Sequence, residues 1–217
     1  MLIDLTFSIE ERMTTPNVYW HPKVEIVGLG TISKENRNTH KLVLGTHTGT
    51  HMDAPRHLIE GGQTIDQIDP ALFVQKALLM KFDNKGAGDF IDHDELAHYD
   101  SLLSGVSAVV IRTGWSKWWM TDKYYKQWPY LSEKAAQYLV DKGIKVIGMD
   151  MPSPDSADRL TPGSSSPIHC QLMGQGIILV EYLNNLELIN KDIFKLYSFP
   201  LKLKGLDGSP ARVLAEV

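Results

Sequence analysis

The 217-residue sequence predicts an α/β (mixed α+β) fold, because short apolar runs typical of buried strands alternate with segments that carry helix-capping signals. The chain is long enough to bury a substantial core. Its composition, with 43% hydrophobic and 22% charged residues, is that of a globular protein. No repeat, low-complexity block or long linker divides the sequence, so we expect residues 1–217 to form a single domain.

The first half of the chain contains mostly strand signals. Four segments read as strands, the last two being short apolar runs of the buried type: residues 23–31, 39–46, 75–82 and 106–112. Between these last two, Asp92 and Glu95 have the spacing of a capping box, which predicts the start of a short helix. The first two strands lead directly into a histidine-rich segment.

The second half of the chain alternates helices with strands. A helix is expected from Ser132 to Lys142, with Gly143 at its C′ position, and it leads into the apolar strand 145–150. Residues 151–167 are rich in proline and serine, so we expect a loop there. The tail beyond this loop has further strand-like stretches, which indicates that the sheet includes the C-terminal segment.

The histidine-rich segment 47–57 carries the strongest functional signal, with three of the chain's eight histidines. In an extended strand, His47, Gly49, His51 and Asp53 would share one face, and the glycine would leave space for a cation. Two imidazoles and a carboxylate suit zinc or manganese. An i, i+4 histidine pair also occurs on metalloprotease helices, but the glycine, the threonines and the following proline disfavour a helix. A turn rich in polar residues is the remaining alternative.

Two isolated residues are candidate additional ligands. Ser166 followed by Pro167 predicts a helix start, which puts His169 in the first helical turn. Glu181 ends the apolar strand 176–180, where a carboxylate is poorly solvated unless it has a partner. The structural alternative for His169 is a histidine at a helix start, and for Glu181 a glutamate at the end of a strand. A metal site in segment 47–57 would need further ligands, and one histidine with one glutamate would supply them.

Charge and composition exclude several classes of partner. The net charge of −4 provides no electrostatic reason to expect nucleic acid or an anionic membrane. No apolar run approaches the roughly 20 residues that span a bilayer, and the N-terminal residues lack the pattern of a signal peptide. The single cysteine, Cys170, fits a reducing cytoplasm. We interpret it as a small buried hydrophobic residue rather than a nucleophile.

The pattern His-x-Gly-Thr-His-x-Asp-Ala-Pro-x-His resembles the signature of the metal-dependent cyclase hydrolase family, which includes bacterial kynurenine formamidase and isatin hydrolase. The resemblance extends over nearly the whole chain. It includes Asp4-Leu5-Thr6, Arg112-Thr113-Gly114-Trp115, Ile147-Gly148-Met149-Asp150 and Asp207-Gly208-Ser209-Pro210-Ala211-Arg212. It implies a swivelling β/β/α fold and a homodimer or homotetramer in which partner chains contribute to the mouth of the site.

The resemblance also implies a metal centre. His47, His51 and Asp53 match the positions that bind the first ion, and in binuclear members the aspartate reaches the second. His169 and Glu181 match the remaining ligand positions. Members of the family carry zinc, or manganese in isatin hydrolase, so the resemblance implies one or two Zn²⁺ ions, with Mn²⁺ as the alternative.

Three further residues receive roles from the resemblance. His57 matches the histidine that donates and accepts protons. An unperturbed imidazole pKa of about 6.5 suits that role, and the alternatives are a metal ligand or a surface residue. Tyr19 and Trp20 lie in a segment similar to the aromatic stretch that faces substrate in formamidases. Two extra residues between Asp4 and Pro16 leave open which of the two stacks on the substrate.

These observations predict an enzyme that acts on a small aromatic amide. A metal-bound water would supply the nucleophile near neutral pH. We expect an arylformamidase (kynurenine formamidase) that hydrolyses N-formylkynurenine to kynurenine and formate in tryptophan catabolism. The alternatives are an isatin hydrolase or another hydrolase of small cyclic amides or lactones, and a metal-binding protein without turnover. The aromatic residues between 115 and 130 are interpreted as helical core or oligomer interface, with a substrate-lining wall as the alternative.

Overall fold

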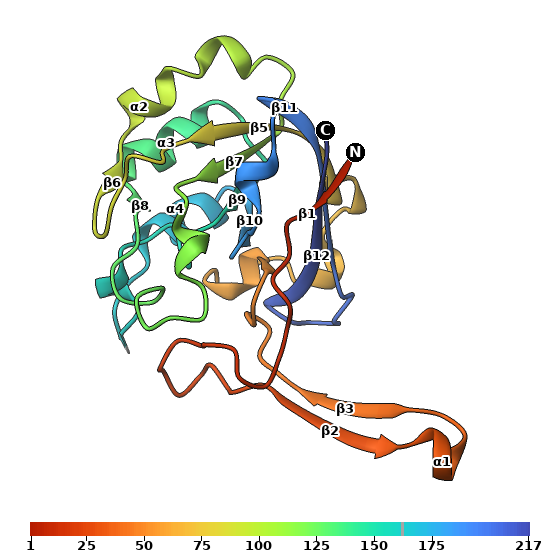
Figure 1. The fold of residues 1–217 in the computed structure, drawn as a ribbon. Helices are drawn as coiled ribbons and strands as arrows, with labels where there is room; N and C mark the ends of the chain where they lie inside the picture. The colour runs from red at the N-terminus through yellow and green to blue at the C-terminus, as the bar shows by residue number, and fades with distance from the viewer. Residues whose placement is uncertain (162) are drawn as a thin grey trace.

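The structure is a computed structural model that describes residues 1–161 and 163–217. Its central element is an eight-stranded sheet with the order β1-β12-β11-β5-β7-β9-β10-β4. β4 also pairs with β12, so the sheet closes into a barrel (Figure 1). The strands are β1 Leu2–Asp4, β4 His51–Asp53, β5 Val74–Lys81, β7 Ala108–Arg112, β9 Val146–Met149, β10 Ile178–Glu181, β11 Ile193–Pro200 and β12 Gly208–Glu216.

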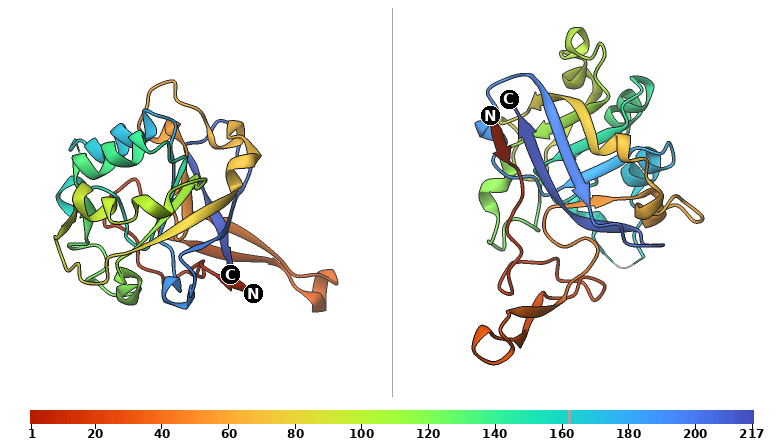
Figure 2. Two further views of the ribbon diagram at one scale, coloured as in Figure 1. Left: turned by 90° about the horizontal axis from the view of Figure 1, so that it is seen from above. Right: turned by 90° about the vertical axis from the view of Figure 1, so that its right-hand side faces the viewer.

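Helices cover the side of the barrel formed by its parallel strands. β5, β7, β9 and β10 are parallel, and parallel neighbours require crossover connections. The connections carry α2 His93–Ala97, α3 Glu133–Asp141 and α4 Pro167–Met173, which form one layer outside the sheet (Figure 2). A small second sheet pairs β6 Phe90–Ile91 with β8 Tyr130–Leu131. No helix in the described part of the chain has the length and apolar character needed to cross a bilayer.

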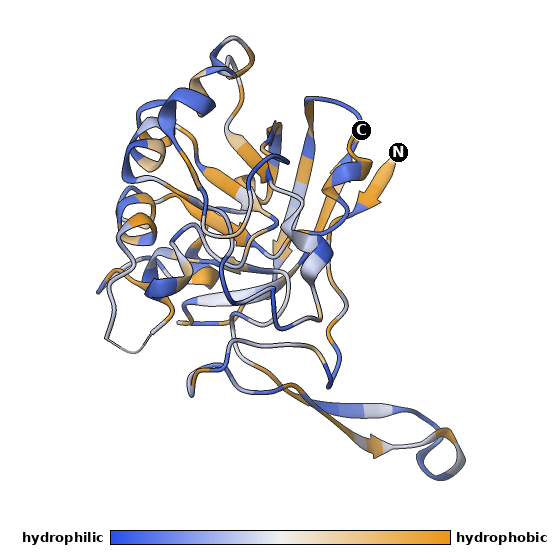
Figure 3. Cartoon of the chain, turned by 60° about the vertical axis from the view of Figure 1, so that its left-hand side comes forward, coloured by the Kyte–Doolittle hydropathy of each residue, from blue (hydrophilic) through white to orange (hydrophobic). Residues whose placement is uncertain are grey.

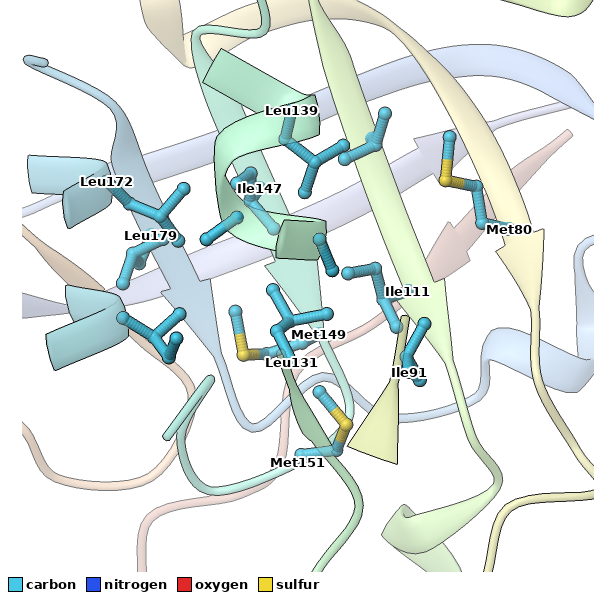
Figure 4. Close-up of a cluster of buried hydrophobic side chains, with 14 of the residues drawn as sticks. Met80, Ile91, Ile111, Leu131, Leu139, Ile147, Met149, Met151, Leu172 and Leu179 are labelled. Atoms are coloured by element: carbon cyan, nitrogen blue, oxygen red, sulfur yellow. The ribbon is translucent and has the colours of Figure 1, made fainter. Parts of the chain in front are cut away.

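The alternation of side chains along each barrel strand divides the core into two clusters. On β5, Ala77 and Leu79 face the barrel interior, whereas Leu78 and Met80 belong to the cluster between the sheet and the helices. Figure 4 shows this outer cluster, in which Leu139 of α3 and its neighbours cover the sheet. Figure 3 shows the resulting pattern, with hydrophobic residues on the central strands and hydrophilic residues on the outer helix faces.

Several local predictions are confirmed. The predicted strands 75–82, 106–112 and 145–150 correspond to β5, β7 and β9 within two residues at each end. The capping box of Asp92 and Glu95 is present at the start of α2. Likewise, Ser132 caps α3 by accepting from the Ala135 N–H. In each case the signal and the structure it predicts lie within a few residues of each other.

The loop prediction for residues 151–167 is confirmed in part. The segment contains a 3₁₀ helix, Ala157–Arg159, and α4 begins at Pro167. Residue 162 lies outside the described residues. Further along, the predicted strand 176–180 is observed as β10, and the strand-like tail forms β11 and β12.

The predicted single extended strand through the histidine-rich segment was wrong. The preceding strand ends at Val43, residues 46–50 form turns and bends, and only β4 is extended. Gly49 has φ +61°, a left-handed conformation that a strand does not contain. The space beside it is also filled, because an added Cβ would meet Met13 and Ile9 at 3.3 and 3.6 Å. His47 therefore reaches the site from a turn rather than from the strand.

The interpretation of Cys170 as a buried residue was also wrong, because the cysteine is exposed. The buried side of α4 carries Ile168, His169, Leu172 and Met173. These positions follow helical spacing, and residue 170 lies between them on the solvent side.

The aromatic residues between 115 and 130 are core residues, but their segment is not an α-helix. Trp115, Tyr124 and Trp128 are buried in the cluster between sheet and helices. Only the 3₁₀ helix Trp115–Trp118 forms. Trp128 also lines the cavity described below, so the core interpretation and the substrate-wall alternative both apply to this residue.

A hairpin protrudes from the body of the molecule. It pairs β2 Glu25–Gly30 with β3 Thr39–Val43, and the short helix α1 Ile32–Glu35 lies near its tip (Figure 1). Apolar side chains on this hairpin are exposed, with Leu29 at 63% and Leu42 at 59%.

Asp150 joins the ends of two neighbouring parallel strands. It follows β9, is fully buried, and accepts hydrogen bonds from the backbone N–H groups of Thr113, Gly114 and Trp115 and from the Thr113 hydroxyl. Burial raises the pKa of the Asp150 carboxyl to about 6. Through its hydrogen bonds to residues 113–115, the Asp150 side chain fixes the turn that follows β7, where Gly114 has φ +70°.

We expect Asp150→Ala to lower the free energy of unfolding by about 3 kcal/mol or more, because it leaves several buried donors without an acceptor. Urea denaturation of the variant and the wild type measures this loss. Asp141→Ala is the matched control, since the exposed Asp141 carboxylate accepts a hydrogen bond from the Gln137 amide one turn earlier on α3. A loss no greater than that of the control would contradict the anchoring role of Asp150.

Candidate metal centre

One cavity collects all the predicted metal and acid–base residues. It has a volume of about 240 Å³ and lies where β4, β10 and the start of α4 meet. Two of these residues come from β4, one from the preceding turn, one from the 3₁₀ helix Pro55–His57, one from α4 and one from β10. They are His51, Asp53, His47, His57, His169 and Glu181.

Strand register brings β4 and β10 into the site. The two strands are antiparallel, and Glu181 pairs directly with His51. Side chains of residues opposite each other in such a pair lie on the same face. His51 Nε2 lies 3.5 Å from Glu181 Oε2 and 3.1 Å from Asp53 Oδ1. The predicted strand-end glutamate therefore meets the histidine-rich segment.

Asp155 positions the start of α4. Ser166 and Pro167 occupy the predicted N-cap and first helical positions, but the Ser166 hydroxyl makes no capping hydrogen bond. The Asp155 carboxylate accepts instead from the Ile168 and His169 N–H groups. It also lies 2.6 Å from His169 Nδ1.

Each of three histidines has one ring nitrogen held by an acceptor outside the cluster. His51 Nδ1 lies 2.8 Å from the Gly49 carbonyl, and His169 Nδ1 lies 2.6 Å from Asp155. His47 Nε2 lies 2.7 Å from Asp207 Oδ2. Such contacts fix the tautomer and the ring orientation of metal-binding histidines.

The opposite nitrogens of these histidines converge on two carboxylates. His47 Nδ1 lies 2.6 Å from Asp53 Oδ1. His169 Nε2 lies 3.3 Å from Glu181 Oε1 and 3.7 Å from Asp53 Oδ2. One group of donor atoms within 4.8 Å of one another joins His51, Asp53 and Glu181, and a second joins His47, Asp53 and His57. Asp53 belongs to both groups.

The electrostatics of this cluster favour a cation. Burial acts against charged groups here, yet Asp53 and Asp207 outweigh it and raise the pKa of His47 to about 10. Burial and the neighbouring Asp53 raise the pKa of Glu181. Glu181 Oε1 is buried and accepts no hydrogen bond of good geometry within the described residues, although His169 Nε2 lies 3.3 Å away. An unsatisfied buried carboxylate oxygen is costly unless a cation compensates it, so this donor set fits a divalent metal ion.

His57 lies at the edge of the cluster. Its side chain is half-buried, and its Nδ1 lies 3.2 Å from Asp207 Oδ2. Asp207 therefore contacts two site histidines, His47 and His57, and these contacts hold the pKa of its carboxyl well below the usual range. Asp207 has no predicted role because it lies 150 positions from His57 and no local signal links the two residues.

Of the two predicted substrate-binding residues, one lines the cavity. Trp20 lines it and is 41% exposed. Tyr19 is 89% exposed, is not among the lining residues described, and contacts the Trp20 ring edge-on at 4.8 Å. His21 and Trp128 also line the cavity. Burial, together with His47, lowers the pKa of His21 to about 4.

A comparison with protein-family models identifies the family of this chain. The Cyclase family model, described as "Putative cyclase", matches residues 3–156. The chain belongs to the cyclase family. A cyclase-family relative, kynurenine formamidase of Bacillus mycoides (strain KBAB4), is 32% identical over 185 residues, which cover 84% of this chain and 83% of the relative.

Solved structures confirm the expected cyclase-family fold. Isatin hydrolase A from Ralstonia solanacearum superposes with a TM-score of 0.87 at 23% identity, over 99% of this chain and 91% of that one. A structure from Bacillus stearothermophilus, described as a predicted metal-dependent hydrolase, gives a TM-score of 0.77 at 27% identity, over 99% and 97% of the two chains. This chain therefore shares its fold with these solved structures.

Proposed function

We propose that this protein is a metal-dependent amidohydrolase, an arylformamidase that hydrolyses N-formylkynurenine to kynurenine and formate in tryptophan catabolism. The observation that carries the proposal is the buried cluster of imidazoles and carboxylates around Glu181 Oε1, which accepts no hydrogen bond of good geometry in the described residues. This cluster opens into a cavity that Trp20 and Trp128 also line. Kynurenine formamidases are relatives over most of the chain, which supports the choice of substrate.

The metal ligands that we propose are the five residues that face one another in the cavity: His47, His51, Asp53, His169 and Glu181. They would hold one or two Zn²⁺ ions, with Mn²⁺ as the alternative. A bound ion of this kind lowers the pKa of a coordinated water and polarises a carbonyl. Asp53 is the residue best placed to serve two ions, because it belongs to both donor groups.

His57 is the residue that we propose for proton transfer. Amide cleavage requires a proton for the departing nitrogen, and an imidazole supplies it near neutral pH. Asp207 lies beside His57 Nδ1 and so orients the ring, which leaves Nε2 for exchange with substrate. Trp20, with Tyr19 at its edge, would contact the aryl ring of the substrate.

The experiment measures metal content and turnover together. Protein saturated with zinc or manganese is expected to bind one or two ions per chain and to hydrolyse N-formylkynurenine faster than isatin. Faster hydrolysis of isatin or of another cyclic amide or lactone would establish the alternative, which the likeness to isatin hydrolase folds supports. Metal binding without turnover of any of them would indicate a non-catalytic metal-binding protein.

The proposal also includes the domain organisation, the oligomeric state and the cellular location of the enzyme. We propose that residues 1–217 act as one domain, since a single sheet includes strands from both ends of the chain. A homodimer or homotetramer would cover the exposed apolar side chains of the β2–β3 hairpin, and light scattering of the purified protein measures this assembly. The single cysteine agrees with a cytoplasmic location.

A further inference from the structure

The wall of the cavity formed by the loop before α4 differs from the metal-binding side. Its lining residues on this segment include hydroxyl groups and one arginine: Ser153, Ser156, Arg159, Thr161, Ser164 and Ser166. Arg159 is the one arginine or lysine among the described residues that line the cavity. Arg159 is exposed, and it lines both this cavity and a neighbouring hollow beside β8 and the start of α4.

Arg159 has no carboxylate partner among the described residues. Its guanidinium contacts the Ser165 hydroxyl at 3.4 Å, and no ion pair links it to a carboxylate within residues 1–161 and 163–217. Arg112 and Arg212, by contrast, form ion pairs with carboxylates outside the cavity.

The acidic residues of the cavity are engaged elsewhere. Asp155 lies against His169 and the first N–H groups of α4. Asp53 and Glu181 face the histidine cluster. None of the three acidic residues that line the cavity pairs with Arg159, so its guanidinium is open to an anion from outside the chain.

We propose that Arg159 is a specificity-determining residue that binds a free carboxylate of the substrate, at the end remote from the scissile amide. The inference rests on the proposed function and narrows it to aryl formamides that carry a carboxylate. A guanidinium forms directed, charge-assisted hydrogen bonds with a carboxylate. The α-amino acid group of N-formylkynurenine has such a carboxylate and isatin has none, so Arg159 favours the former.

The test compares two formamides that differ at the amino acid end. N-formylkynurenine carries the carboxylate, whereas N-formyl-2-aminoacetophenone retains the aryl ketone and the formamide without it. In Arg159→Gln, KM for N-formylkynurenine is expected to rise about tenfold, the effect of losing one partly exposed charge-assisted pair. We expect kcat for this substrate, and both constants for the neutral formamide, to stay within about twofold. For N-formylkynurenine, the KM of Arg159→Lys should lie between those of the wild type and Arg159→Gln, because lysine keeps the charge but lacks the planar guanidinium fork.

Arg37→Gln is the matched control. It removes the same charge from an exposed site on the β2–β3 hairpin, away from the cavity, where the Arg37 guanidinium contacts the Glu35 carbonyl. An unchanged KM in this variant would show that the effect of Arg159→Gln is local rather than a change in net charge. An equal rise in KM for both formamides, or no rise for N-formylkynurenine, would overturn the proposal.

Calorimetric titration with the products separates this inference from the proposed function. Kynurenine is expected to bind the wild type about tenfold more tightly than Arg159→Gln, whereas 2-aminoacetophenone should bind both equally. These ligands need no turnover. If the wild type hydrolyses neither formamide, the arylformamidase proposal fails, and the titration still decides whether Arg159 recognises a carboxylate. Equal affinities of kynurenine for wild type and variant would reject that recognition.

Discussion

His51→Ala is expected to remove at least one bound metal ion and nearly all hydrolase activity. His51 is 1% exposed, and its Nε2 lies within 3.5 Å of both Asp53 and Glu181. The variant loses a neutral imidazole from the centre of the proposed ligand set and leaves two buried carboxylates facing each other. Such a site loses affinity for a divalent ion, because the remaining donors no longer surround it. Elemental analysis after dialysis and an N-formylkynurenine assay measure the two effects.

The control for this prediction is His98→Ala, which changes an exposed histidine just beyond the end of α2. It should retain its full metal content and activity. Circular dichroism of His51→Ala shows whether the loss of metal occurs in a folded protein. Full metal occupancy in folded His51→Ala would contradict the assignment of this histidine as a ligand.

His57→Ala is expected to keep its metal while kcat falls by about two to four orders of magnitude, the range for loss of a general acid–base group. His57 lies at the rim of the cluster, with its side chain 30% exposed, and contacts Asp207 rather than Glu181. The proposed ligands His51, Asp53 and Glu181 are all retained in this variant. Metal analysis and steady-state kinetics on the same preparation separate binding from proton transfer.

A different outcome would reassign His57. This residue belongs to one of the two donor groups, together with His47 and Asp53, so a loss of metal in parallel with kcat would make it a ligand. Asp207→Asn is a second variant that keeps the imidazole and weakens its orientation. We expect it to lower kcat less than His57→Ala does, because the proton-transfer group itself remains.

The two ends of the histidine-rich segment show what can be predicted from neighbouring residues. His51 and Asp53 lie on one short strand, where alternation places both side chains on the same face, as the sequence predicts. His47 reaches the same cavity by a different route, through the turn at Gly49. The sequence pattern identifies the residue types correctly, whereas the left-handed turn at Gly49 sets the path of the chain between them.

By itself, the sequence determined the kinds of elements and the chemistry of the donors, because capping boxes, apolar runs and the spacing of histidines act over a few residues. The tertiary structure alone decided which distant residues share the cavity. The pairing of β4 with β10 sets Glu181 against His51, and the pairing of β4 with β12 brings in the segment that carries Asp207. Asp155 and Arg159 line the cavity from the loop before α4. Glu181 and Asp207 lie more than a hundred residues from His51 along the chain, so no local pattern links them to it. The strand pairings of the closed barrel make them neighbours.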